Sequence, residues 1–204
     1  MNVYHGSYIE IKNPDFSHSR IDIDFGAGFY LTEDKRMASK WATNRHISIL
    51  NEYELDLKGL NVIILNLSEE WLDFVASNRG YSLTEFDIQG VDVIIGPTAD
   101  DKMFLTLSSC FEGVISKEQT MKYLNIAGYS NQIVLKTEKA LSHLSFIKSK
   151  EIRGLEKINL KKETIYERQL SARALEEMLE KDKAHLIPDV RKLKGNTGEE
   201  QDGG

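Results

Sequence analysis

Apolar residues recur along the first 150 positions in short runs that predict strands. Residues 61–67 and 91–95 are nearly continuous apolar runs, which is typical of strands buried on both faces. Residues 47–56 alternate between apolar and polar side chains, as a strand with one buried face does. The predicted strands are an opening strand at Val3 and Tyr4, and residues 47–56, 61–67, 91–95, 132–137 and 145–149.

Capping residues and helical spacing predict helices between these strands. Thr32, followed by Glu33 and Asp34, has the features of a helix start, and Ser68 is a second N-cap. A third helix is expected over residues 101–111.

Two further helices are predicted toward the C-terminus. One begins at Ser116, where Gln119 completes a capping box. The other is a long helical pattern over residues 161–186, and one side of it has an apolar stripe. The stripe consists of Ile165, Ala172, Leu175 and Leu179.

These strands and helices mix without a regular strand–helix–strand alternation, which favours an α+β fold. A boundary near residue 150 separates a body (1–150) from a helical C-terminal extension (151–194). Residues 195–204, GNTGEEQDGG, are expected to form a disordered tail. The long helix either packs on its own domain or docks a partner protein through its apolar stripe.

Composition narrows the class of protein further. The 204 residues are 41% apolar and 28% charged, a balance typical of globular proteins. No apolar run approaches about 18 residues, and no signal peptide is evident, so no membrane span is expected. Cys110 is the single cysteine, which excludes an internal disulfide and fits a reducing, cytoplasmic location. The histidines do not cluster with carboxylates, so no metal site is expected.

The net charge of −6 is unevenly distributed. Residues 1–147 carry 13 basic and 20 acidic side chains, whereas residues 148–194 carry 13 basic and 9 acidic side chains. The acidic body repels phosphate backbones at long range. If nucleic acid is a partner, the basic segment is its expected binding site; otherwise these charges form a solvated helix surface.

Two stretches combine glycine with polar or aromatic side chains: YHGS at positions 4–7 and FGAGFY at positions 25–30. The second is not the dinucleotide-binding fingerprint G-x-G-x-x-G, because Leu31 stands where the third glycine is required. Its two glycines bracket a turn that allows a close backbone approach or a positive φ. The aromatic residues beside the turn are either core residues or walls of a pocket for a flat ring.

Together the two stretches, followed by a helix with Ala38, Ser39 and Trp41, resemble the ADP-ribosyltransferase superfamily. The branch that they resemble is the poly(ADP-ribose) polymerase and diphtheria-toxin type, which has a His-Tyr-Glu triad. Within it, the nearest match is a bacterial domain-of-unknown-function family with this fold. The resemblance covers roughly residues 3–147. It implies a split antiparallel β-sheet core with flanking helices in a catalytic domain, and NAD as the co-substrate.

In this resemblance the opening stretch binds the nicotinamide half of NAD. His5 would hydrogen-bond a ribose hydroxyl, since one ring nitrogen can donate while the other accepts. Gly6 would offer its backbone N–H and C=O to the carboxamide, and Ser7 would add a hydroxyl. Tyr30 would stack on the nicotinamide ring. The remaining NAD-binding candidates are Arg20 near the diphosphate, Phe25 as a pocket wall and Gly28 at a close backbone approach.

The third position of the implied triad, His5, Tyr30 and Gln132, departs from the family pattern. Gln132 stands at the start of the last core strand, where the family has a glutamate. A glutamine keeps the hydrogen bond to the ribose but loses a charge worth up to roughly 4 kcal/mol at about 4 Å. That bounds the loss of rate near a thousandfold, so activity need not be abolished.

Other acidic residues are candidates to face the acceptor or to replace the missing carboxylate. Asp100 and Asp101 follow a predicted strand, and Glu138 is a weaker candidate next to another strand end. The alternative for Asp100 is a turn in which it caps the next helix.

The resemblance implies a mono-ADP-ribosyltransferase that transfers ADP-ribose from NAD to a protein or a nucleic acid. Such a small enzyme resembles bacterial toxins of toxin–antitoxin or phage-defence systems, and an antitoxin would dock on residues 161–186. One alternative is a pseudoenzyme that binds NAD or ADP-ribose without turnover. Another is an interaction module that keeps only the fold, and hydrolysis of NAD by water is also open.

Overall fold

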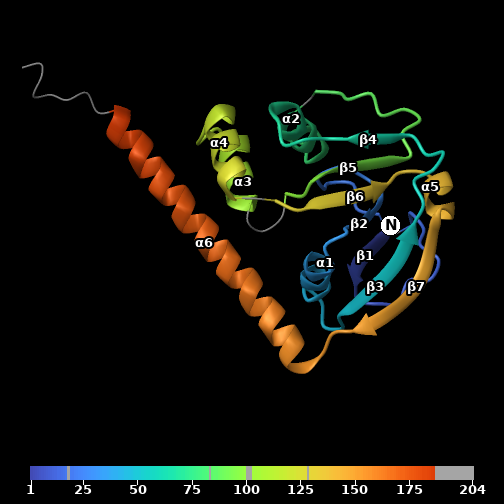
Figure 1. The fold of residues 1–204 in the computed structure, drawn as a ribbon. Coiled ribbons are helices and arrows are strands. Elements are labelled where there is room, and N and C mark those ends of the chain that lie inside the picture. The colour runs from blue at the N-terminus through green and yellow to red at the C-terminus, as the bar shows by residue number, and fades with distance from the viewer. Residues whose placement is uncertain (18, 83, 100–102, 128, 187–204) are drawn as a thin grey trace, which may run out of the picture.

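The computed structural model describes residues 1–17, 19–82, 84–99, 103–127 and 129–186. The chain forms two β-sheets with helices around them, which confirms the predicted α+β class (Figure 1). The strands are β1 (Asn2–Ser7), β2 (Phe29–Leu31), β3 (Ile49–Leu55), β4 (Val62–Ile64), β5 (Val93–Pro97), β6 (Asn131–Leu135) and β7 (Leu144–Glu151). The helices are α1 (Lys35–Ala42), α2 (Glu69–Asn78), α3 (Phe104–Phe111), α4 (Lys117–Ala127), α5 (Glu138–Ser142) and α6 (Gly154–Leu186).

The two sheets differ in strand direction. The sheet β1-β3-β7 is antiparallel throughout, whereas β4 and β5 run parallel in the sheet β2-β6-β5-β4. The helix α2 connects β4 to β5, because parallel strands need a long crossover. The sheets meet at a bridge, where the Tyr4 N–H donates to the Thr32 carbonyl at 2.8 Å and the Thr32 N–H donates to the Tyr4 carbonyl at 3.0 Å. Within the described residues, β1 and β2 pair at this bridge alone.

Hydrophobic clusters lie on both faces of the four-stranded sheet. On one face, Leu31 and Ile133 pack with Tyr53 of the other sheet, so this cluster joins the two sheets. Because neighbours along a strand point to opposite faces, Phe29 belongs to this cluster while Tyr30 packs against the second one. The second cluster includes Phe25, Trp71, Phe74, Ile94 and Val134.

The start of α1 differs from the prediction. The helix begins at Lys35, because the Asp34 carboxylate accepts the N–H groups of Arg36 and Met37 and is therefore the N-cap. Thr32, the predicted cap, belongs instead to the bridge between the sheets. Because Thr32 is in extended backbone at this bridge, the helix begins only after it, at Lys35.

Other local predictions have mixed outcomes. The Ser68 hydroxyl accepts a first-turn N–H of α2 at 3.2 Å, as expected. Ser116 and Gln119 form the predicted capping box, with reciprocal bonds of 2.8 and 3.1 Å. The prediction of a buried strand around Ile64 is wrong, because β4 has three residues at the sheet edge and Ile64 is 67% exposed.

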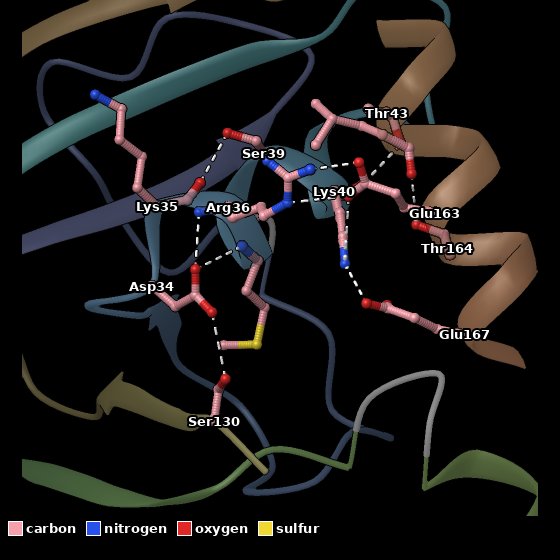
Figure 2. Close-up of polar contacts among 12 residues, drawn as sticks. Asp34, Lys35, Arg36, Ser39, Lys40, Thr43, Ser130, Glu163, Thr164 and Glu167 are labelled. Carbon is pink, nitrogen blue, oxygen red and sulfur yellow. Dashed lines mark hydrogen bonds and ion pairs between the residues drawn. The ribbon is translucent and has the colours of Figure 1, made fainter. Parts of the chain in front are cut away.

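The long helix α6 lies against α1 through ion pairs, which Figure 2 shows. The Arg36 guanidinium contacts both carboxylate oxygens of Glu163. One turn further along each helix, Lys40 Nζ lies 2.7 Å from the Glu167 carboxylate. Near the middle of α6, the Tyr123 hydroxyl of α4 donates to the Ser171 carbonyl at 2.9 Å. The helix therefore packs on its own body along part of its length.

The predicted apolar stripe of α6 is divided between the body and the solvent. Leu175 is buried, whereas Ile165 is 55% exposed. Among the described residues, no helix combines the length and apolar character needed to cross a membrane. The tail predicted over residues 195–204 lies outside the described residues, and the division at residue 150 stays a prediction.

Candidate functional site

His5 lies near the end of β1 and is held from two directions. Its ring stacks on Phe29 with centroids 4.5 Å apart and an angle of 24° between the planes. Nδ1 lies 2.7 Å from the Tyr30 carbonyl oxygen. A carbonyl can only accept, so Nδ1 carries the proton and donates it. Because burial lowers the pKa of His5, the imidazole is neutral, which leaves Nε2 as an acceptor.

Gly6 lies just beyond the bridge between the sheets. In an antiparallel strand, the N–H and C=O groups of successive residues point to opposite edges, so those of Gly6 share the edge used by Tyr4. In the described structure the segment around β2 pairs with β1 only at Tyr4. The N–H and C=O of Gly6 therefore face the same edge beyond the end of the paired segment. Within the described chain, neither group has a hydrogen-bond partner at this edge. The edge therefore offers one donor and one acceptor side by side, as a planar carboxamide requires.

The packing of α1 gives Gly6 a second reason to be glycine. A Cβ at this position would lie 2.1 Å from the Ala38 carbonyl oxygen and 2.6 Å from the Ala42 nitrogen. The next residue, Ser7, is half-buried, and its hydroxyl accepts the Ile9 N–H at 3.4 Å. The opening motif thus serves helix packing as well as any ligand.

Tyr30 is fixed by the turn that precedes it. Its hydroxyl donates to the Gly26 carbonyl at 2.8 Å and accepts the Phe25 N–H at 3.0 Å. Burial, helped by the nearby Asp24 carboxylate, raises the pKa of the Tyr30 hydroxyl. The phenol is therefore a neutral structural link rather than a base.

The turn before Tyr30 is also held from β6. Lys136 Nζ donates to the carbonyls of Phe25 and Ala27, the first at 2.7 Å, and burial lowers the pKa of this lysine to about 8. Gly28 is needed where the backbone passes β6, because a Cβ there would lie 2.4 Å from a methyl group of Val134. Phe25 is fully buried in the core, which favours the core interpretation over the pocket wall.

Gln132 points into a buried polar network centred on Asp24. Its Nε2 donates to Asp24 Oδ2 at 3.0 Å and to the Pro97 carbonyl at 3.5 Å. The Arg79 guanidinium donates through Nε to Asp24 Oδ1 at 3.0 Å, and the Ala99 N–H donates to Oδ2 at 2.9 Å. Asp24 and Gln132 are 7% and 3% exposed. A carboxylate thus lies beside the Gln132 amide.

Of the remaining predicted residues, the structure describes Arg20 and Glu138. Arg20 is exposed, and its charge acts to lower the pKa of Tyr30 against the larger effect of burial. Asp100 and Asp101 lie outside the described residues. Glu138 follows the end of β6 opposite to Gln132, so the structure separates it from this network.

The predicted triad is arranged around β2 rather than gathered at one point. His5 packs on the Phe29 side of the strand, whereas Gln132 lies on the Tyr30 side. His5 meets Tyr30 through the backbone carbonyl, while the Asp24 carboxylate influences the Tyr30 hydroxyl and binds Gln132. His5 and Gln132 are therefore each linked to Tyr30, one through its backbone carbonyl and the other through Asp24, and their side chains do not contact each other.

Sequence reasoning missed Asp24 and Arg79. Asp24 ends a polar loop, and nothing in that loop distinguishes it from other acidic residues. Arg79 follows α2 and is 55 residues away in the chain. The one available signal was position, since Asp24 immediately precedes the glycine-containing turn.

Two surface hollows are lined by residues outside this network. One, between α1 and α6, includes Ser39, Leu160 and Glu163 in its lining, and the other lies beside the end of α2. Neither is lined by His5 or Gln132. The described residues also contain no group of three metal-ligating side chains.

A family model described as "protein of unknown function (DUF3990)" matches residues 1–146. The chain belongs to this family. The matched residues of the DUF3990 domain include both sheets except the last part of β7, together with His5, Tyr30, Asp24 and Gln132. No curated protein and no solved structure matches the chain. The family description assigns no activity to the domain.

Proposed function

We propose that this protein is an NAD-dependent mono-ADP-ribosyltransferase with a macromolecular acceptor. The observation that carries the proposal is that two adjacent residues at the end of β1, His5 and Gly6, have hydrogen-bonding groups without a partner in the described chain. Nε2 of a neutral His5 is an acceptor for a ribose hydroxyl, and the adjacent Gly6 backbone presents a donor and an acceptor. Together they match the hydrogen-bonding groups of the nicotinamide riboside half of NAD.

The proposed reaction breaks the bond between C1′ of the ribose and N1 of nicotinamide. The bonding electron pair leaves with nicotinamide, which becomes neutral. A lone pair of the acceptor forms the new bond to C1′, and the acceptor then loses a proton to solvent. The positive charge that develops on the ribose needs fixed acceptors nearby, and His5 and Gln132 are the residues proposed to supply them.

The identity of Gln132 favours a single transfer over chain elongation. An amide accepts a hydrogen bond from a ribose hydroxyl, but it does not remove the proton as a carboxylate can. The acceptor must therefore be nucleophilic by itself. We further propose that the protein acts as a cytoplasmic bacterial toxin in a toxin–antitoxin or phage-defence system, with an antitoxin as its partner at α6.

The experiment for the transfer uses NAD that is labelled in its adenine ring. Purified protein is incubated with the labelled NAD and a cell extract, and label in macromolecules is measured after nuclease or protease treatment. We expect label that one of the two treatments removes, and no label with His5→Ala. Release of nicotinamide without labelled macromolecules would replace the transferase with an NAD hydrolase.

A binding protein without turnover is the second candidate, and Gln132 is the observation that favours it. Isothermal titration with NAD and with ADP-ribose separates the two functions. Binding without any release of nicotinamide, in the presence of extract, would establish the pseudoenzyme. An interaction module that keeps only the fold would show neither binding nor release.

A further inference from the structure

The Asp24 carboxylate determines the orientation of the Gln132 side chain. Every described partner of Asp24 is a donor: the Arg79 guanidinium, the Ala99 N–H and Gln132 Nε2. An ionised carboxylate only accepts, so it requires the NH₂ end of the Gln132 amide to face it. The Pro97 carbonyl, 3.5 Å from the same nitrogen, imposes the same orientation.

This orientation leaves the carbonyl end of Gln132 available. Both hydrogens of Nε2 are directed to acceptors, so Oε1 is the atom that remains. No described residue donates to Oε1. Oε1 is not one of the fully buried side-chain atoms without a partner in the described chain, which are Ser48 Oγ and Thr106 Oγ1, so it keeps a small accessible area although Gln132 is only 3% exposed.

We propose that Asp24 is a positioning residue that holds Gln132 with Oε1 toward the NAD ribose. A negative charge that accepts from the NH₂ group polarises the amide and makes its oxygen a stronger acceptor. The pair of Asp24 and Gln132 then does what a glutamate at position 132 would do alone. This inference rests on the proposed function and names the residue that compensates for the missing glutamate.

The geometry also explains why position 132 does not carry a glutamate here. A carboxylate at this position would place an oxygen close to Asp24 Oδ2, where Gln132 Nε2 now lies at 3.0 Å. Two carboxylates at that distance cannot both be ionised without repulsion. Introducing the glutamate of the ADP-ribosyltransferase triad by Gln132→Glu alone is therefore expected to lower the activity of the protein.

The test is a charge exchange with four variants: Asp24→Asn, Gln132→Glu, the double variant and Asp92→Asn. In Asp24→Asn, the new amide would keep its oxygen on Arg79, so its NH₂ group would face Gln132 and reverse the Gln132 amide. In the double variant, the carboxylate introduced at position 132 would accept from that NH₂ group. Asp92 is a matched control, since it is a second buried carboxylate at the other end of β6.

The kcat and KM for nicotinamide release from NAD are measured for each variant, beside thermal unfolding. Each single change at 24 or 132 is expected to lower kcat by about tenfold to a hundredfold, the scale of one hydrogen bond to a charged group. The double variant is expected to recover kcat, whereas Asp92→Asn should lose stability and keep its kcat. A structural role for Asp24 would let the double variant recover stability without recovering kcat, which would overturn the proposal.

A ligand-free readout separates this inference from the proposed function. The side-chain amide of Gln132, labelled with ¹⁵N, is compared by NMR in the wild type and in Asp24→Asn. Slow exchange of the amide protons in the wild type, lost in the variant, is expected if Asp24 holds the NH₂ group. Unchanged exchange overturns the inference, whereas failure of the wild type to bind or cleave NAD overturns the proposed function and the ligand named here.

Discussion

At the scale of single residues, His5 combines a fixed tautomer with a lowered pKa. Nδ1 is committed to the Tyr30 carbonyl, so the chemistry available to a ligand is that of Nε2. Protonation would turn Nε2 from an acceptor into a donor. The site is therefore expected to work with neutral His5 and to fail in acid.

The stability of the protein should depend on His5 below neutral pH. Because burial lowers the pKa of His5 in the folded state, the unfolded chain binds the proton more readily, starting near its ordinary pKa of about 6.5. The free energy of unfolding should then fall as the pH drops below about 6.5, and His5→Asn should remove this component. Urea unfolding between about pH 5 and 8 measures it.

The matched control is His143→Asn. His143 is half-buried, and its Nδ1 lies 3.0 Å from the Asp56 carbonyl oxygen, so it makes the same kind of bond elsewhere in the fold. An acid slope that is lost in His5→Asn and kept in His143→Asn is assigned to His5. An unchanged acid slope in His5→Asn would contradict the assignment of a buried neutral imidazole.

Gly6→Ala should destabilise the protein before any ligand is considered. The added Cβ would meet backbone atoms of α1, which cannot move as a flexible side chain does. Overpacking of this kind costs about 1–3 kcal/mol, and denaturant unfolding measures it. Ser7→Ala, one residue further, serves as the control and should change the free energy of unfolding by much less. Equal stability of Gly6→Ala and the wild type would contradict the observed contact of α1 with β1.

At the scale of elements, the ion pairs between α1 and α6 add to the packing of buried Leu160 against α1. Changing Arg36 and Lys40 to Ala removes the cations that face Glu163 and Glu167. Partly exposed pairs contribute about 0.2–1 kcal/mol each, and salt weakens them. Hydrogen exchange within residues 154–180 should therefore become faster in the double variant at low salt.

Salt concentration supplies a second comparison for this interface. At about 1 M salt the wild type and the double variant should differ little in exchange. Lys12→Ala, which breaks the exposed pair of Lys12 and Glu10 in a loop, should leave α6 unaffected. Equal protection of α6 in the wild type and the double variant at low salt would contradict the role of these pairs.

Elements with strong local signals could be predicted, and those set by distant contacts could not. Ser68 and the pair of Ser116 and Gln119 mark helix starts by local hydrogen bonds, so sequence was sufficient there. Neither β2 nor α5 was predicted, because a three-residue strand and a five-residue helix are too short to show a period.

In the candidate site, too, the residues in a local motif could be predicted and those joined by distant contacts could not. The opening motif identified His5 and Gly6. The tautomer of His5 follows from its bond to the Tyr30 carbonyl, and the unpaired edge of Gly6 follows from the bridge at Tyr4. The network of Asp24, Arg79 and Gln132 joins residues that are 55 and 108 positions apart from Asp24. No local pattern records such contacts, so the sequence did not show that Gln132 faces a carboxylate.

At the scale of the whole molecule, the described backbones of the two sheets pair at the Tyr4–Thr32 bridge, and the candidate residues surround it. His5 and Gly6 come from one sheet, and Tyr30 and Gln132 come from the other. With 13 basic and 20 acidic side chains, residues 1–147 carry a net charge of −7, whereas the basic segment 148–194 includes α6. An acidic acceptor such as a nucleic acid would therefore be expected to approach from the side of α6.

The measurement that tests the central claim most directly is the release of nicotinamide from NAD by the purified protein and by His5→Ala. The release is followed with and without cell extract, while circular dichroism verifies that both proteins are folded. We expect release by the wild type that depends on, or increases with, the extract, and none by the folded variant. Equal release by both proteins, or no release and no NAD binding by either, would contradict the assignment of this site to NAD chemistry.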